Sequence, residues 1–184
     1  MQLQDYASAE KDLYAAIKQS RKSYAVYRTL YSALEAQGKD DEAKQVLNDA
    51  LQLSGSSGED YYNRGMIYVD LQDYTNATDM LNKSYDKGYK AALLGLGEVS
   101  YTQQDYDTAL TYYEKYFDEV DISSVDASLA AKAYNQYAAV LLAKGEYEKA
   151  AQACESGLTY NDRESDAALS FNLIVSYEHL ERWE

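Results

Sequence analysis

A short phrase recurs along this chain: a polar residue, an acidic residue and an aromatic residue, with an alanine three positions after the aromatic. The copies start at Gln4, Gly38, Gln72, Gln104 and Gly145, and their alanines are Ala9, Ala43, Ala77, Ala109 and Ala150. The second copy, Gly38-Lys39-Asp40, keeps an acidic residue and the alanine but has no aromatic residue. These alanines are separated by 34, 34, 32 and 41 residues, and a last copy stands at Glu181-Arg182-Trp183. A period near 34 residues is typical of stacked repeats, in which each unit is too small to bury its own apolar face.

Apolar residues at helical spacing surround each copy of the phrase. Tyr61, Gly65 and Tyr68 precede the third copy, and Leu81 follows Ala77 at a distance of four residues. Residues at i, i+4 and i+7 share one helix face, so both segments are predicted to be amphipathic helices with one buried stripe. A short turn joins them, which makes each pair antiparallel. No segment alternates with period two, so no strand is predicted.

The phrase itself predicts a turn between the two helices of each pair. Its Asp or Glu can cap the second helix, where the positive end of the helix favours a carboxylate. Gly38 and Gly145 suit a left-handed residue at the end of the first helix. The Gln residues in the same place lack the conformational freedom of glycine.

This pattern resembles the tetratricopeptide repeat, and the resemblance covers essentially the whole chain. In the third unit the matching residues are Tyr61, Gly65, Tyr68, Ala77 and Leu81, and in the fourth they are Leu93, Leu96, Gly97, Ala109 and Tyr113. Two features depart from the family pattern: the chain has no proline, and Tyr31, Ala138 and Ile174 replace the glycine at the helix crossing. Related helical repeats such as Sel1-like repeats also fit the 32-residue step. The resemblance implies an all-α, right-handed superhelical solenoid of antiparallel helix pairs.

We expect a single repeat domain over residues 1–184, as part of a longer chain. Its units are a partial unit at 1–20, complete units at about 24–57, 58–89, 90–126 and 127–163, and a partial unit at 164–184. The last helix carries Leu173, Ile174, Tyr177 and Leu180 with no sequence left to cover them. Because each repeat buries its face only against a neighbour, the chain is expected to continue or to pair through its ends.

The 41-residue step adds seven residues between Tyr116 and Ala127. Seven residues are about two helical turns, so longer helices can absorb them. A protruding acidic loop is the other interpretation. We favour longer helices with a short acidic turn, since long unstructured loops are uncommon in compact domains.

Composition excludes several classes of function. The 31 Asp and Glu against 17 Lys and Arg give a net charge of −14, which repels nucleic-acid phosphates. One His and one Cys exclude a disulfide framework and zinc sites with several such ligands. No run approaches 18 apolar residues, so no membrane span is predicted. The compartment stays open: a single Cys fits the cytosol, and a removed leader would place the domain in a bacterial envelope.

No catalytic constellation is present in the sequence. His179, the only imidazole, is expected on the surface or at a helix end, and Cys154 occupies a packing position. The acidic stretch 118–126 lacks the residue order of a calcium loop, and residues 54–58 lack the motif of a phosphate-binding loop. We therefore expect no enzymatic activity, no cofactor and no metal.

A second apolar row on the first helix of each pair is the candidate binding site, and we call it the first-helix row. Its candidate binding residues are Arg28, Tyr62, Met66, Val69, Leu94, Glu98, Tyr101, Asn135, Leu142 and Phe171. In the tetratricopeptide family this row lines a concave groove that holds a peptide. The resemblance implies a non-catalytic scaffold for a protein or peptide with apolar anchors and positive charge. Plain burial of the row between neighbouring first helices is an equally open interpretation.

Charge is uneven along the chain. Residues 1–53 hold 7 Lys and Arg against 8 Asp and Glu, net −1, whereas residues 54–184 hold 10 against 23, net −13. This uneven charge would draw a cationic partner to residues 54–184. The other interpretation is that the acidic surface only keeps the protein soluble. The alternative function is a structural assembly or oligomerisation domain that stacks through its uncapped terminal helices.

Overall fold

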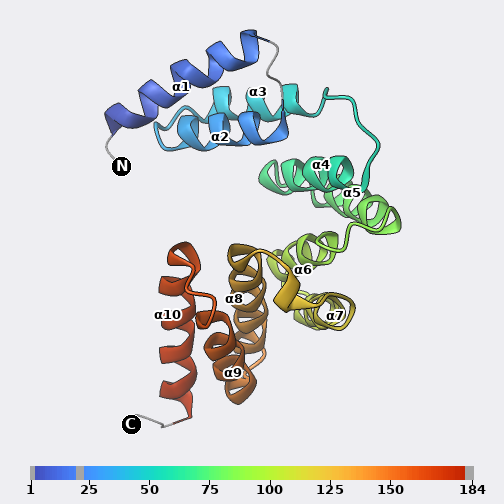
Figure 1. Cartoon of the computed structure of the whole chain (residues 1–184), viewed down its shortest axis with the longest axis vertical. Coiled ribbons are helices and arrows are strands. Elements are labelled where there is room, and N and C mark those ends of the chain that lie inside the picture. Colours follow the sequence, from blue (N-terminus) through green and yellow to red (C-terminus); the bar gives the residue numbers. More distant parts are fainter. Residues whose placement is uncertain (1–2, 20–22, 181–184) are drawn as a thin grey trace. The chain divides into compact units, whose positions relative to one another are not determined.

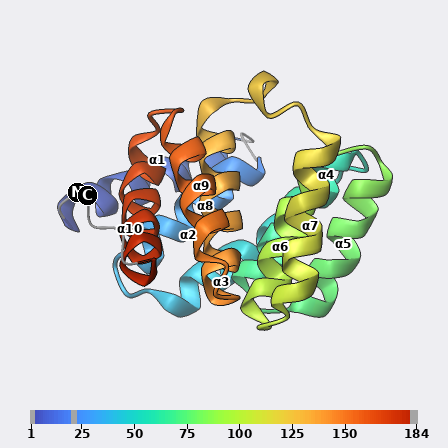
Figure 2. The ribbon, with the colours of Figure 1, turned by 90° about the horizontal axis from the view of Figure 1, so that it is seen from below.

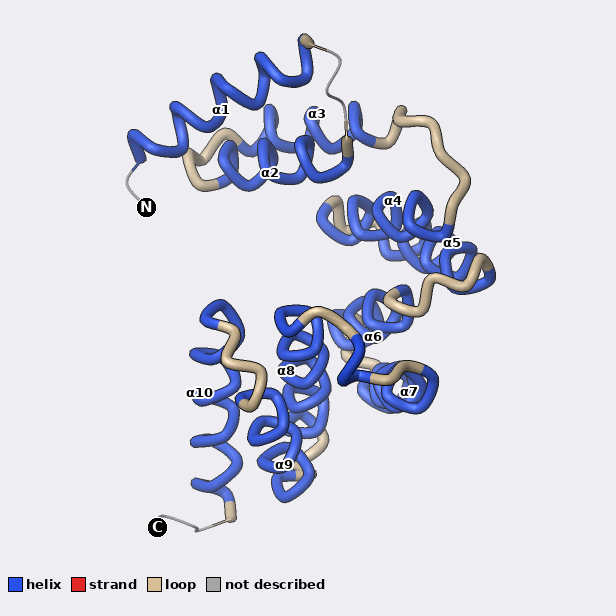
Figure 3. Tube along the Cα trace, viewed as in Figure 1, coloured by secondary structure: helices blue, strands red, loops and turns tan. Residues whose placement is uncertain are grey.

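The computed structural model describes residues 3–19 and 23–180. Within these residues there are ten α-helices, one 3-10 helix and no strand (Figures 1 and 3). The helices are α1 Leu3–Lys18, α2 Tyr24–Glu35, α3 Asp40–Ala50, α4 Gly58–Asp70, α5 Tyr74–Asp86, α6 Ala92–Thr102, α7 Tyr106–Glu119, η1 Ile122–Ser124, α8 Ala127–Ala143, α9 Tyr147–Leu158 and α10 Arg163–His179. The predicted all-α class is confirmed.

The chain divides into two compact units, Met1–Tyr89 and Lys90–Glu184. The first unit contains α1 to α5 and the second contains α6 to α10. Each unit has a hydrophobic core of its own, and the expectation of a single domain over 1–184 stays a prediction.

In the first unit each helix packs against the next one along the chain, from α1 through α5. The core contains Leu30 and Leu34 of α2, Leu47 of α3 and Ile67 of α4, all without exposed surface. Leu13 of α1 packs on this cluster. Leu30 and Leu34 stand four residues apart, so the buried stripe predicted from helical spacing is the one that packs.

In the second unit α8 contacts both α6 and α10. Helix α7 packs against α6 and α8, and α9 packs against α8 and α10 (Figure 2). The core joins Ala138 and Leu141 of α8, Ala150 and Cys154 of α9, and Leu169 of α10. Small alanines at these positions allow the helix backbones to approach closely.

Four helix-to-helix turns share one backbone geometry. The positive φ angles are 72° at Gly38, 60° at Gln72, 63° at Gln104 and 75° at Gly145. The next residue in each turn donates its N–H to the carbonyl five positions back, at 3.0, 2.8, 2.9 and 2.8 Å. This pair of features is the Schellman ending of a helix. The prediction is confirmed for the two glycines, and the two glutamines adopt the same left-handed conformation despite their Cβ atoms.

The acidic residue of the phrase caps the second helix in two of these turns. Asp73 accepts a hydrogen bond from the Asn76 N–H at 3.1 Å, and Asp105 accepts one from the Thr108 N–H at 3.1 Å. The N-cap residues Lys39 and Glu146 make no side-chain capping bond. Capping is therefore confirmed for the two Asp copies alone.

At the first copy of the phrase the prediction of a turn is wrong, because Gln4 and Asp5 lie inside α1. The helix already includes Leu3, so the acidic residue stands in its first turn, where the helix dipole favours it. The last copy, Glu181-Arg182-Trp183, lies outside the described residues.

The 41-residue step lengthens a helix and adds a short turn, as we favoured. Helix α8 has 17 residues, against 13 in α4 and 11 in α6. The connection 120–126 contains the 3-10 helix, and Asp121 accepts a hydrogen bond from the Ser123 N–H at 3.1 Å. A long acidic loop does not form there.

Two glycines sit where a first helix crosses its second helix. A Cβ placed on Gly65 would lie 2.7 Å from Leu81 Cγ, and one on Gly97 would lie 2.6 Å from Tyr113 Cζ. Both distances are far shorter than van der Waals contact, so only glycine fits at this spacing. The sequence match to the repeat pattern thus has a packing cause at both positions.

Candidate peptide-binding face

In the first unit, most of the first-helix row is taken up by packing. Met66 is 2% exposed, and Tyr62 and Val69 are half-buried. The Tyr62 ring lies 5.2 Å from the Tyr89 ring, centroid to centroid. Helix α4 therefore offers little free apolar surface at these positions, in line with the plain-burial interpretation for Met66.

Arg28 joins the first helices α2 and α4. Its Nε atom lies 3.3 Å from Asp70 Oδ2. Arg28 also lines an open pocket of about 540 Å³ between these helices, together with Tyr24, Glu59 and Asn63. The pocket is lined by one guanidinium and by carboxylates, so the positive charge of Arg28 is already balanced by acidic residues of the pocket itself.

On α6 of the second unit, the row changes from buried to exposed along the helix. Leu94 is 3% exposed, Glu98 is half-buried and Tyr101 is 38% exposed. The Tyr101 ring lies 5.6 Å from the Tyr106 ring of α7. Tyr101 is thus held by one ring contact and keeps a free surface.

Two polar bridges join the three first helices of the second unit. Gln136 of α8 donates to Glu98 of α6 at 3.0 Å, and Asn172 of α10 donates to Asn135 of α8 at 3.0 Å. These bonds bring the row residues Glu98 and Asn135 to the contacts between neighbouring helices. The sequence analysis missed the bridging side chains, although each directly follows a row position along its helix.

The remaining row residues of the second unit differ in exposure. Leu142 of α8 is half-buried, whereas Phe171 of α10 is 66% exposed. Among the described residues the exposed large hydrophobic side chains are Tyr14, Tyr101, Phe171 and Ile174. Two of these four belong to the first-helix row. Of the uncovered residues predicted on the last helix, Ile174 is 54% exposed, while Leu173, Tyr177 and Leu180 are half-buried.

Cys154 and His179, the side chains considered for catalysis, are both engaged in packing contacts. Cys154 has no exposed surface, and burial raises the pKa of its thiol to about 12. The His179 ring stacks on the Tyr147 ring at 4.1 Å and 7°. Within residues 3–19 and 23–180, no three His, Cys, Asp or Glu side chains lie close enough to hold a metal ion.

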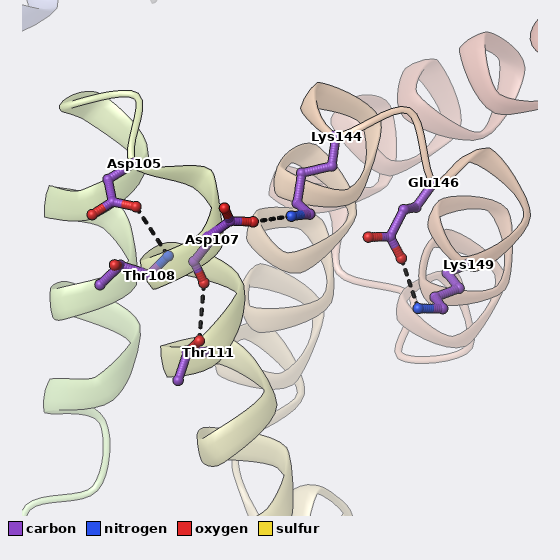
Figure 4. Close-up of polar contacts among 7 residues, drawn as sticks. All are labelled: Asp105, Asp107, Thr108, Thr111, Lys144, Glu146 and Lys149. Atoms are coloured by element: carbon purple, nitrogen blue, oxygen red, sulfur yellow. Dashed lines mark hydrogen bonds and ion pairs between the residues drawn. The ribbon is translucent and has the colours of Figure 1, made fainter.

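Polar contacts gather at the turns that begin α7 and α9 (Figure 4). Lys144 pairs with Asp107, which joins the end of α8 to the start of α7. Lys149 lies 2.6 Å from Glu146 within its own turn. The Thr111 hydroxyl donates to the Asp107 carbonyl at 2.9 Å. Hydrogen bonding to the Asp107 carboxylate raises the pKa of Lys144. These groups hold turns and neighbouring helices together.

Comparisons with known proteins agree with this fold. Residues 62–121 match the tetratricopeptide repeat family. One similar structure is the hetero-tetramer Cut9-Hcn1, with a TM-score of 0.64 and 18% identity over 96% of this chain and 36% of that chain. The chain therefore spans about a third of that protein's length. No curated protein sequence matches the chain.

Two further similar structures are tetratricopeptide proteins. One is YrrB, described as having an unusual peptide-binding site, with a TM-score of 0.54 and 22% identity over 94% of this chain and 85% of that chain. The other comes from Parabacteroides merdae ATCC 43184, with a TM-score of 0.57 and 22% identity over 97% and 68% of the two chains.

The fold is thus an all-α, tetratricopeptide-like solenoid of helix pairs. Residues 62–121 match the tetratricopeptide repeat family and the similar structures share this fold, in agreement with the resemblance found in the sequence. In the parts of the chain that the structure describes, no helix has the length and apolar character needed to cross a bilayer.

Proposed function

We propose that the chain is a non-catalytic scaffold that binds a peptide or protein segment on the exposed side of its first helices. One observation carries this proposal: Tyr101 and Phe171, two of the four exposed large hydrophobic side chains, occupy predicted binding positions. Exposed aromatic side chains are frequent anchors in protein recognition. The peptide-binding site named for YrrB supports the use of this fold for such a partner.

The partner we propose carries apolar anchors and positive charge. Residues 90–184 hold 7 Lys and Arg against 17 Asp and Glu, a net charge of −10. Glu98 lies three residues before Tyr101 on α6, and Glu178 lies seven residues after Phe171 on α10, so each shares a helix face with one of the exposed rings. A basic segment is drawn to such a surface, and its apolar side chains can cover the exposed rings.

A basic peptide array, followed by affinity measurement on the best hit, tests this proposal. The double variant Tyr101→Ala with Phe171→Ala is expected to weaken binding by about tenfold or more, since truncating anchor residues costs over 1 kcal/mol. Tyr14→Ala is the matched control, because Tyr14 is 41% exposed and lies outside the row. Equal losses in the two variants, or no loss in the double variant, would contradict the proposal.

The exposed face of α10 favours a second candidate function, self-assembly. Phe171 and Ile174 stand three residues apart on α10 and are 66% and 54% exposed, so they form one apolar strip. Light scattering over a range of protein concentrations distinguishes the two functions. Assembly predicts a mass that rises with concentration and falls back to one chain in Ile174→Glu. A constant mass of one chain contradicts it.

A further inference from the structure

A pocket in the second unit lies between α7, η1 and α8. Its volume is about 490 Å³. It is lined by Glu114, Phe117, Asp118, Ile122, Tyr134 and Tyr137. None of these described lining residues carries a positive charge. The pocket therefore combines aromatic side chains with two carboxylates.

The aromatic rings of this pocket contact one another across the two helices. The Phe117 centroid lies 4.8 Å from the Tyr134 ring and 5.4 Å from the Tyr137 ring. Behind them, the Tyr160 ring stacks on Tyr134 at 6.1 Å, and the Tyr116 ring meets Phe117 edge-on at 5.8 Å. These contacts fix the ring orientations before any ligand arrives, which lowers the entropic cost of binding.

Two carboxylates line the pocket beside the rings. Glu114 and Asp118 are one helical turn apart on α7, and both are exposed. Burial, and then the Glu114 charge, raise the pKa of Tyr137, as expected for a carboxylate near that ring. The nearby cations have other carboxylate neighbours: Lys149 pairs with Glu146 at 2.6 Å, and Lys115 lies 3.8 Å from Glu119.

The pocket is distinct from the first-helix row. Tyr137 follows the row residue Asn135 by two positions, and each residue advances an α-helix by about 100°. The two side chains therefore leave α8 on nearly opposite sides. A ligand in this pocket does not need the surface that holds Tyr101 and Phe171, so the inference stands whether or not that surface binds a peptide.

We propose that this pocket binds the side chain of an arginine carried by a partner protein. A guanidinium is planar, stacks on the faces of aromatic rings and donates two parallel hydrogen bonds to a carboxylate. Phe117, Tyr134 and Tyr137 supply the faces. Glu114 and Asp118 supply the acceptors. A lysine ammonium would pair with the carboxylates, but it is not planar and would not stack on the aromatic rings.

The probe that tests this site is N-acetyl-arginine methylamide, followed by NMR on protein labelled with 13C-phenylalanine. The chain has two Phe residues, Phe117 in the pocket and Phe171 on α10, so the second is an internal control. We expect a saturable shift of the Phe117 signals and none of the Phe171 signals. The neutral analogue N-acetyl-citrulline methylamide should give no saturable shift, and the lysine analogue should bind more weakly. Equal binding of either analogue would overturn the assignment.

Charge variants locate the site. Glu114→Gln with Asp118→Asn should weaken the arginine probe by about tenfold, the scale of removing charged partners at a partly desolvated site. Asp41→Asn with Glu42→Gln is the matched control, since it removes the same charge from exposed positions on α3 of the first unit. Tyr101→Ala on the first-helix row should leave the affinity unchanged. Equal weakening by the control pair, or a loss in Tyr101→Ala, would overturn the proposal.

Discussion

Gln72 and Gln104 hold a backbone conformation that usually belongs to glycine. Their φ angles of 60° and 63° match the turn geometry of Gly38 and Gly145. The left-handed conformation costs a residue with a Cβ about 1–2 kcal/mol. Glycine removes this strain, but it loses more backbone entropy on folding, so only part of the strain energy is gained as stability. We therefore expect Gln72→Gly and Gln104→Gly each to stabilise the protein by about 0.5–1 kcal/mol in urea unfolding.

The neighbouring residue Gln103 provides the control for this prediction. Its φ of −80° is ordinary for any residue, so Gln103→Gly relieves no strain. It should lower the free energy of unfolding, because glycine gains chain entropy in the unfolded state. Equal effects of Gln103→Gly and Gln104→Gly would contradict the strain argument.

The Cys154 thiol is expected to be unreactive toward thiol reagents in the folded protein. Burial raises the pKa of the thiol to about 12, so the reactive thiolate is scarce at pH 8. An aromatic disulfide reagent should therefore react only as fast as the protein opens, and at once in concentrated urea. Rapid labelling of the native chain at pH 8 would show that the thiol is accessible, contrary to its place in the core.

Between elements, Gly97 sets the approach of α6 to α7. A methyl group there would lie 2.6 Å from Tyr113 Cζ, so Gly97→Ala should destabilise the protein by about 1–3 kcal/mol, as overpacking does. Thermal unfolding of a double-mutant cycle checks the cause. In a Tyr113→Ala background the same substitution should cost much less, because the clashing ring is gone. Additive effects in the cycle would contradict the clash.

An ion pair attaches α1 to the turn between α2 and α3. Glu10 Oε2 lies 2.7 Å from Lys39 Nζ and 2.9 Å from Gln37 Nε2. The Lys39 hydrogen bond, and then that of Gln37, lower the pKa of Glu10 below its ordinary 4.5. A lowered pKa stabilises the folded state above pH 4.5, and this contribution is lost as the pH falls through the lowered value.

Glu10→Gln should therefore lower the thermal midpoint by about 1–3 °C at pH 7, the scale of a partly exposed pair. The difference from the unchanged protein should shrink as the pH drops below 4. Asp12→Asn, on an exposed position of the same helix, should show no such trend. A difference that is independent of pH would contradict the assignment to the Glu10 charge.

Local patterns in the sequence were enough to predict the helix pairs and the Asp caps, because each depends on residues close in sequence. The glycines at the helix crossings were expected from the resemblance to the repeat family, because each packs against a residue 16 positions away. The bridges from Gln136 and Asn172 could not be predicted in the same way, since they join helices that are 37 or 38 residues apart. The exposure of Phe171 and the burial of Met66 likewise depend on how helices stack. The pocket proposed to bind arginine could not be predicted either, because it depends on the relative positions of α7, η1 and α8.

For the whole molecule, the net charge of −14 predicts an unusual response to salt. Self-repulsion among 31 acidic groups opposes the compact state, and added ions screen it. The free energy of unfolding in urea should therefore be higher in 0.3 M than in 0.02 M sodium chloride. A fall in stability over this range would mean that the ion pairs outweigh the repulsion. Sucrose at equal osmolarity is the control for effects other than screening.

The placement of the bridging amides has a consequence for how such a protein can diverge. Asn172 holds α10 to α8, while Phe171, one position earlier, is exposed. Two adjacent positions on α10 thus differ: Asn172 bonds to the neighbouring helix, and the Phe171 side chain is open to solvent. Under the function proposed above, substitutions of Phe171 would change which partner binds, while the hydrogen bond of Asn172 to Asn135 would still hold α10 against α8.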